Sequence, residues 1–208
     1  IKPAGLLGMD ILSDYRVYVD AEEKVFHLIP RNIPAPKLPG SWRYIALKSN
    51  PFQTDHHDLH YMDIRLGNQL LPALLDTGSE ANIMNWSVSR FPGLKRARKK
   101  IYDDWVLSGA IGVFDPISRV RVKNFRAGQK FWKAQDFIVM DFDNLGVLGI
   151  NDQPFIIAGV NLLAERTFYL DFETNQLLIK PDKDDLAGRM RTGVEVYVGS
   201  EPYEERRQ

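Results

Sequence analysis

The chain has 208 residues, of which 44% are hydrophobic and 26% are charged, with 27 basic and 27 acidic side chains. This length and composition predict one globular domain, or one and a fraction, and exclude intrinsic disorder and collagen-like order. The balanced charge predicts no nucleic-acid partner, and no apolar run is long enough to span a bilayer. The absence of cysteine excludes disulfides, thiolate metal sites and cysteine nucleophiles. It leaves the compartment open, and we favour a periplasmic or secreted location over a cytoplasmic one.

Short β-rich runs dominate the chain. The first two, at 17–19 and 25–29, flank a polar stretch and predict a hairpin. A proline-dense segment follows, and we expect residues 31–56 to form an extended connector rather than a packed element. Further strands are expected at 61–66, 70–75, 106–113, 120–122 and 137–140, with turns at Gly67-Asn68 and Ala127-Gly128-Gln129.

This succession of short strands predicts an all-β, barrel-like domain. The middle of the chain contains one expected short helix, at residues 85–90. Residues 182–208 are rich in charge, and we expect them to form a charged C-terminal tail.

An internal repeat relates the two ends of the chain. Residues 8–30, shifted by 151 positions, align with residues 159–181, and most of the aligned positions are identical or pair apolar with apolar. The identical pairs are Gly8 and Gly159, Leu12 and Leu163, Tyr18 and Tyr169, Asp20 and Asp171, Glu22 and Glu173, and Pro30 and Pro181. The alternative is that two unrelated hairpins share the chemistry of strands.

A true repeat implies that residues 1–30 close a domain whose opening part lies before Ile1. The chain also lacks an initiator methionine. We therefore expect it to be a processed product or an excised fragment.

The clearest candidate site lies within residues 70–84. Apolar strand residues 73–75 lead directly into Asp76-Thr77-Gly78-Ser79. A strand fixes the position of a carboxylate at such a break, backbone N–H groups of the turn can reach it, and Gly78 lets a substrate or main chain come close. The alternative is a structural turn in which Asp76 caps its own loop.

This motif resembles the active-site loop of retropepsin-like aspartic peptidases, in particular the bacterial relatives of the retroviral enzymes. Residues 155–161 resemble the second landmark of that family, a hydrophobic-hydrophobic-Gly step, and residues 162–165 would begin the short helix that follows it. Residues 107–113 stand where the family places its flap. The resemblance therefore implies flap and substrate-binding residues at Ser108, Gly109, Ala110, Ile111 and Gly112.

The resemblance implies an all-β fold in which residues 57–181 form a closed, retropepsin-like β-barrel lobe with short helices. Residues 1–30 match only the last landmark of the family. They would be the closing segment of a second, similar lobe that precedes the connector.

An aspartic endopeptidase without a cofactor is the activity that the resemblance implies. Such enzymes use two carboxylates that share one proton, because like charges so close together cannot both ionise. Asp76 would be one of the two, and Thr77 would brace the two active-site loops against each other. The chain contains no second Asp-Thr-Gly or Asp-Ser-Gly, so the partner carboxylate must come from another lobe or chain.

We expect two kinds of partner: a polypeptide substrate, and the chain that supplies the second aspartate. The latter would be an upstream fragment of the same precursor or, as second choice, another copy in a homodimer. In both cases residues 1–30 would pack against that separate chain. Two other interpretations stay open, namely a non-catalytic retropepsin-like module for dimerisation or peptide binding, and a structural barrel with a fortuitous Asp-Thr-Gly.

Three histidines lie close together before the first strand of this lobe. His57 and His60 could share a helix face and bind a metal, with His56 beside them. A solvated entry segment is the more common use of such residues at this position, so the sequence predicts no metal site.

Overall fold

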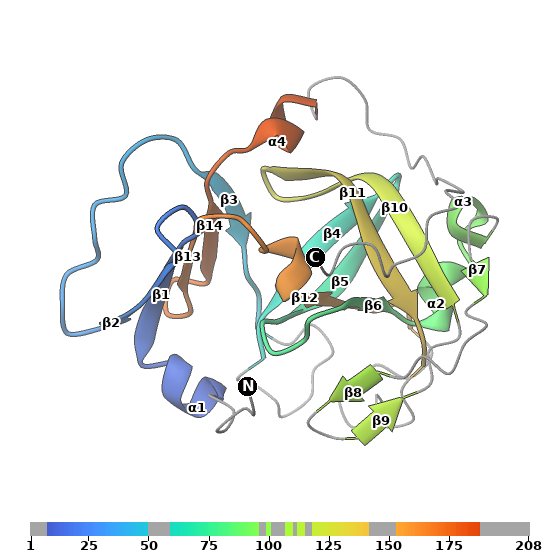
Figure 1. Cartoon of the computed structure of the whole chain (residues 1–208), viewed down its shortest axis with the longest axis horizontal. Coiled ribbons are helices and arrows are strands. Elements are labelled where there is room, and N and C mark those ends of the chain that lie inside the picture. The colour runs from blue at the N-terminus through green and yellow to red at the C-terminus, as the bar shows by residue number, and fades with distance from the viewer. Residues whose placement is uncertain are drawn as a thin grey trace.

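The computed structural model describes residues 8–49, 59–95, 99–100, 107–109, 112–114, 118–141 and 153–187. Figure 1 shows a barrel beside a smaller sheet, which contains the N-terminal strands. The elements are α1 (Met9–Leu12), β1 (Tyr15–Asp20), β2 (Val25–Pro30), β3 (Arg43–Ala46), β4 (Tyr61–Leu66), β5 (Gln69–Asp76), β6 (Asn82–Met84), α2 (Trp86–Ser89), α3 (Pro92–Lys95), β7 (Lys99–Lys100), β8 (Leu107–Gly109), β9 (Gly112–Phe114), β10 (Ser118–Ala127), β11 (Lys130–Val139), β12 (Ile156–Gly159), the 3-10 helix η2 (Val160–Leu162), β13 (Phe168–Asp171), β14 (Gln176–Ile179) and α4 (Lys183–Ala187).

The barrel consists of six strands that form a closed ring. Their order is β11-β6-β12-β5-β4-β10, and β10 also pairs with β11, which closes the ring (Figure 1). Apolar side chains fill the barrel, because alternate residues of each strand point inward and most of these residues are apolar. Phe125 stacks on Trp132 with ring centroids 5.2 Å apart, and Phe137 meets Phe125 edge to face at 5.7 Å. The predicted all-β closed lobe with short helices is confirmed.

The helices are few and short. α2 begins where it was expected, because the Val88 N–H donates to the side-chain oxygen of Asn85 at 3.3 Å and so caps the helix. The expected helix after Gly159 is the single 3-10 turn η2. Among the described residues, no helix has the length and apolar character that a membrane span requires.

The smaller sheet has the order β2-β1-β13-β14-β3 and joins the two ends of the chain. The predicted hairpin is β1–β2, and β1 pairs antiparallel with β13 of the same chain. One edge of the hairpin is therefore covered by this chain itself, and the expected packing of residues 1–30 against a separate chain stays a prediction. Strand β13 has β14 on one side only, so its other edge accepts the apolar strand β1.

The prediction that residues 31–56 form an extended, Pro-rich connector without a packed element is wrong for one part of it, because residues 43–46 form strand β3. β3 pairs with β14, Ile45 is only 1% exposed, and Leu47 is buried as well. The alternation of residues 43–47 is a strand pattern that the preceding prolines obscured. Residues 50–58 lie outside the described part of the chain.

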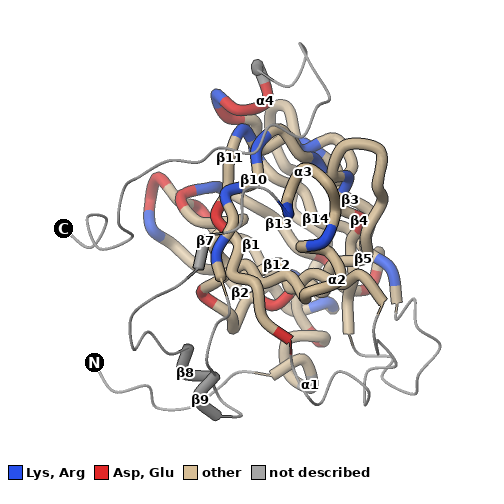
Figure 2. Tube along the Cα trace, turned by 90° about the vertical axis from the view of Figure 1, so that its right-hand side faces the viewer, with Lys and Arg blue, Asp and Glu red and all other residues tan. Residues whose placement is uncertain are grey.

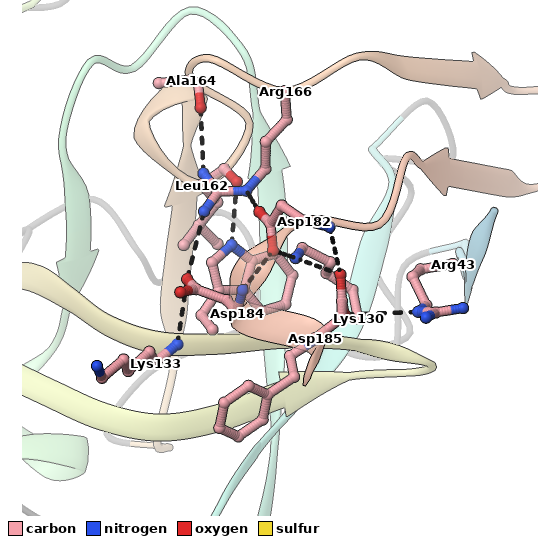
Figure 3. A network of polar contacts seen from close by, with 11 residues as sticks. Arg43, Lys130, Lys133, Leu162, Ala164, Arg166, Asp182, Asp184 and Asp185 are labelled. Atoms are coloured by element: carbon pink, nitrogen blue, oxygen red, sulfur yellow. Dashed lines mark hydrogen bonds and ion pairs between the residues drawn. The ribbon is translucent and has the colours of Figure 1, made fainter. Parts of the chain in front are cut away.

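The charged tail expected from residue 182 begins instead with the docked helix α4. Lys130 Nζ lies 2.8 Å from Asp182 Oδ1 and 2.9 Å from Asp185 Oδ2 (Figure 3). The side chains of Lys130 and Asp185 are 0% and 2% exposed. Arg166 donates to Asp182 at 2.8 Å, and Arg43 lies 3.6 Å from Asp185. These ion pairs hold α4 on the barrel, and Figure 2 shows its acidic residues beside basic ones.

Replacing Lys130 by methionine should destabilise the fold strongly. The change keeps most of the apolar stem but leaves the buried Asp185 without its nearest cation, which costs on the order of 3–5 kcal/mol. Urea unfolding measures the free energy. Lys133→Met is the matched control, because Lys133 lies on the same strand with an exposed side chain. Equal losses in the two variants would contradict this role of Lys130.

The stability contributed by Asp182 should depend on pH. Burial raises the pKa of this carboxyl, but the hydrogen bond and charge of Lys130, with Arg166, outweigh burial and hold the pKa below its usual value. A lowered folded-state pKa stabilises the protein above the unfolded pKa of about 4, and this contribution is lost as the pH falls through the folded pKa.

Urea unfolding of the wild type and of Asp182→Asn between pH 7 and pH 3 tests this. We expect the wild type to be the more stable near pH 7 and the difference to shrink below about pH 4. A difference that stays constant over this range would refute the assignment.

Candidate active site

Asp76 stands at the end of a strand in the wall of the barrel. β12 runs parallel to β5, with Ala158 opposite Leu75 and Gly159 opposite Asp76. The strands are apolar because both of their faces are largely covered, and Ala73 and Ala158 are fully buried. The first polar residue after this apolar run is therefore the aspartate at the barrel's edge.

The loop after β5 turns back on the Asp76 side chain. The N–H groups of Gly78 and Ser79 donate to Asp76 Oδ1 at 2.9 and 3.2 Å. The Ser79 hydroxyl donates to the Ala81 carbonyl oxygen at 2.9 Å. Asp76 is nevertheless partly exposed. Backbone donors thus fix one carboxylate oxygen, while the carboxylate stays accessible to water.

Gly159 lies directly beneath this loop. A Cβ atom at Gly159 would come within 2.3 Å of the Ala81 carbonyl oxygen and 2.7 Å of the Ser79 carbonyl oxygen. The next N–H group, that of Val160, donates to the Ser79 carbonyl oxygen at 2.7 Å. Only glycine permits this approach of two backbones, so the loop rests on a surface that a side chain would destroy.

Two buried asparagines, which were not identified from the sequence as site residues, stand at the start of β6 and directly after it, and they bond to β12 and to the segment before it. Asn82 accepts a hydrogen bond from the Gly159 N–H at 3.1 Å. Asn85 accepts one from the Phe155 N–H at 3.1 Å and donates to the Gln153 carbonyl oxygen at 2.7 Å. Both asparagines are less than 5% exposed. The available signal was a polar residue on each side of the short apolar run 83–84.

The remaining loop residues predicted for the site lie at its outer side. Thr77 and Gly78 are exposed, and Ser79 is partly buried. The role of Thr77 as a brace between two loops stays a prediction.

The predicted flap contains a β-hairpin. β8 and β9 pair antiparallel, with Ser108 opposite Val113 and Gly109 opposite Gly112. A single strand was expected over 106–113, and this is corrected to two short strands. Ala110 and Ile111 lie outside the described residues, and the role of the hairpin as a flap stays a prediction.

Of the three clustered histidines, only His60 belongs to the described residues, and its ring lies 4.9 Å from that of Phe172. His56 and His57 lie outside the described part. Within that part, no group of three or more histidine and carboxylate side chains could hold a metal ion.

Gly159→Ala should destabilise the loop that carries Asp76. Its methyl group must displace backbone atoms of Ala81 and Ser79, and overpacking of this kind typically costs about 1–3 kcal/mol. Amide hydrogen exchange of residues 76–82 measures the local effect, and we expect faster exchange there.

Gly40→Ala is the contrasting control. Its φ is +82°, but a Cβ there meets no atom within 4 Å. The control should lose stability through backbone strain without affecting exchange in the loop. Unchanged loop exchange in Gly159→Ala would contradict the close approach.

Solved structures of similar architecture include the following two. One is a retropepsin-like aspartic protease from Rickettsia conorii, with 16% sequence identity and a TM-score of 0.41 over 70% of this chain and 96% of that one. The other is the retroviral protease-like domain of Ddi1 from Leishmania major, with 17% identity and a TM-score of 0.40 over 66% of this chain and 94% of that one. No protein-family model and no curated protein matches the chain.

The lobe is a closed all-β barrel with short helices, as the sequence resemblance predicted. Its own geometry has the features of that resemblance: a closed barrel, a strand that ends in Asp-Thr-Gly, and a parallel strand whose terminal glycine lies under the loop.

Proposed function

We propose that this chain is part of an aspartic endopeptidase that hydrolyses peptide bonds in extended polypeptide segments. Asp76 and an aspartate from another lobe or chain would hold the attacking water between them. The observation that carries the proposal is the setting of Asp76. It is accessible, fixed at one oxygen by two backbone N–H groups, and supported from below by Gly159.

The proposed chemistry requires two carboxylates within a few ångströms that carry one proton between them. The ionised carboxylate takes a proton from the water, whose oxygen attacks the peptide carbonyl carbon. The protonated carboxyl group donates its proton to the carbonyl oxygen. When the tetrahedral intermediate breaks down, the C–N bond cleaves and the leaving amine takes the proton that the first carboxylate received from the water. A hydroxyl proton of the intermediate returns to the other carboxylate, so that the pair again carries one proton.

The geometry around Asp76 suits this chemistry. Two N–H donors on Oδ1 hold the carboxylate in one orientation, so less reorganisation is needed when the charge moves. The loop contacts the main chain at Gly159 rather than side chains. Such a contact cannot shift through a change of side-chain rotamer. Both features favour a carboxylate with a defined position.

The β8–β9 hairpin supports a preference for extended substrates. Backbone groups of a strand pair readily with an extended peptide, which adds hydrogen bonds without demanding a particular side chain. In the proposed enzyme, residues 108–112 would cover the bound peptide and exclude water.

Asp76→Asn should abolish peptide cleavage and leave the fold intact. The amide keeps an acceptor oxygen for the N–H groups of Gly78 and Ser79, but it cannot exchange a proton with water. General acid–base catalysis contributes roughly 10²–10⁴-fold to rate, so we expect at least that loss. Cleavage of a peptide library by the protein purified together with its natural partner measures it.

Glu80→Gln is the matched control, because Glu80 is an exposed carboxylate on the same loop. It should cleave at the wild-type rate. A statine-type inhibitor, whose hydroxyl group replaces the attacking water, should block both wild type and control. Cleavage by Asp76→Asn at the wild-type rate would exclude Asp76 as the catalyst.

A non-catalytic module for peptide binding or dimerisation is the second candidate. The observation in its favour is that the chain contains only one Asp-Thr-Gly. If the protein with its partner binds library peptides but cleaves none, this second function replaces the first.

A further inference from the structure

The sequence repeat has a counterpart in the backbone. Gly8 precedes α1 with φ −84° and ψ 174°, and Gly159 precedes η2 with φ −76° and ψ 174°. Lys24 and Asn175, which the same shift of 151 aligns, both have positive φ, 54° and 52°. Residues 8–30 and 159–181 therefore follow the same path through a helical turn, a strand, a left-handed turn and a second strand.

The pairing of β1 with β13 has the symmetry of this repeat. Tyr18 lies opposite Tyr169, its own counterpart, and Val17 lies opposite Leu170, the counterpart of Val19. Such a register maps onto itself when the two segments are exchanged, as in a self-complementary two-fold interface. A local pseudo-two-fold axis therefore passes between Tyr18 and Tyr169.

The two halves of the sheet differ at their outer edges. β14 is covered by β3, whereas β2 ends the sheet among the described residues. The Leu47 N–H donates to the Asn175 carbonyl oxygen at 2.8 Å, so residues 175, 177 and 179 turn their backbone groups toward β3. Their counterparts on β2 are Lys24, Phe26 and Leu28, whose backbone groups point outward.

Exposure of apolar side chains follows the same asymmetry. Phe26 is 57% exposed, and its counterpart Leu177 is fully buried. Ile11 is 47% exposed, and its counterpart Leu162 is also fully buried. The second segment is covered by its own lobe, and the first presents the same apolar positions to solvent.

We propose that the outer edge of β2, together with the apolar face of Ile11 and Phe26, binds a separate polypeptide that forms the opening part of a like lobe. A strand of that polypeptide, equivalent to β3, pairs antiparallel with β2 through Lys24, Phe26 and Leu28. The inference rests on the proposed function, because this partner is the source of the second aspartate. Under the pseudo-two-fold axis, Gly8 supports the partner's aspartate loop as Gly159 supports that of Asp76.

A second copy of this chain does not fit the same position. Its β3 is already paired with its own β14, and its Asp76 loop already rests on its own Gly159. The segment 8–30 of one copy could enter the lobe of another only by displacing residues 159–181. A polypeptide that lacks such a closing segment has no competing contact.

Photo-crosslinking in the natural source cells tests the partner. The photoreactive residue p-benzoylphenylalanine replaces Phe26 in one sample and Leu70, which is 52% exposed on β5, in the other. We expect Phe26→p-benzoylphenylalanine to form one heterologous adduct. Its partner should contain two hydrophobic residues followed by Asp-Thr-Gly or Asp-Ser-Gly, and the crosslink should lie N-terminal to that motif. The Leu70 sample should form no such adduct.

A crosslink to a second copy, a partner without the motif, the same adduct from both positions, or no adduct would each overturn the proposal. Phe26→Asp provides the quantitative test. It should reduce the partner retained on the tagged chain at least tenfold, whereas Leu70→Asp should retain it. The thermal unfolding midpoint of the partner-free chain should change little in Phe26→Asp, because the side chain is exposed there. Partner retention by Phe26→Asp equal to that of the wild type would also overturn the proposal.

Amide exchange tests the register. In the complex, exchange at Phe26 and Leu28 should slow, and exchange at Val25 and His27, whose N–H groups face β1, should change little. All of these readouts are independent of cleavage. A partner that binds as proposed without peptidase activity would refute the proposed function alone, and peptidase activity from a homodimer would refute this inference alone.

Discussion

The absence of a side chain at Gly159 is the constraint on which the candidate site depends. It lets the backbone after β5 lie on the backbone after β12, with Val160 bonded to the Ser79 carbonyl oxygen. The parallel pairing of β5 and β12 places the glycine there, and the closed barrel holds the two strands in register. The position of Asp76 is therefore set by main-chain contacts over the whole lobe rather than by the loop alone.

A second constraint joins the barrel to the smaller sheet. Lys130 belongs to β11, Arg43 to β3 and Asp185 to α4, and the three charges meet in one network (Figure 3). A buried lysine with two carboxylates costs desolvation energy, which is offset only if every partner stays in place. Nearby, the Trp132 indole N–H donates to the Leu162 carbonyl oxygen at 3.1 Å, so the same region also fixes η2. The cluster therefore connects three elements, β3, β11 and α4, that are far apart in the sequence.

The sequence predicted those features that are encoded locally. Asp76 could be identified because an apolar strand, a carboxylate and a glycine follow one another directly, and α2 because Asn85 is a good N-cap. Strand β3 was missed because prolines precede it and because its partner, β14, lies about 130 residues further on. The buried state of Lys130 was missed for a related reason, since its partners are 52 and 55 residues away. Periodicity records which residues are apolar, but it does not record which distant charges will meet.

Asn124 lies inside β10 with a φ of 55°. Before it the buried residues of the strand are even-numbered, and after it they are odd-numbered, and no obvious sequence signal marks this change.

The pairing of β1 with β13 has a consequence for how the chain folds. Arg16 and Asp171, which are hydrogen-bonded across these strands, are 155 residues apart, so this contact closes a loop of that length. Contacts of such long range form slowly, because the entropy of loop closure is lost before the contact is gained. During synthesis β1 emerges well before its partner β13. Until β13 emerges, the edge of β1 that it covers stays unpaired, and at this stage a chaperone has a large influence on yield.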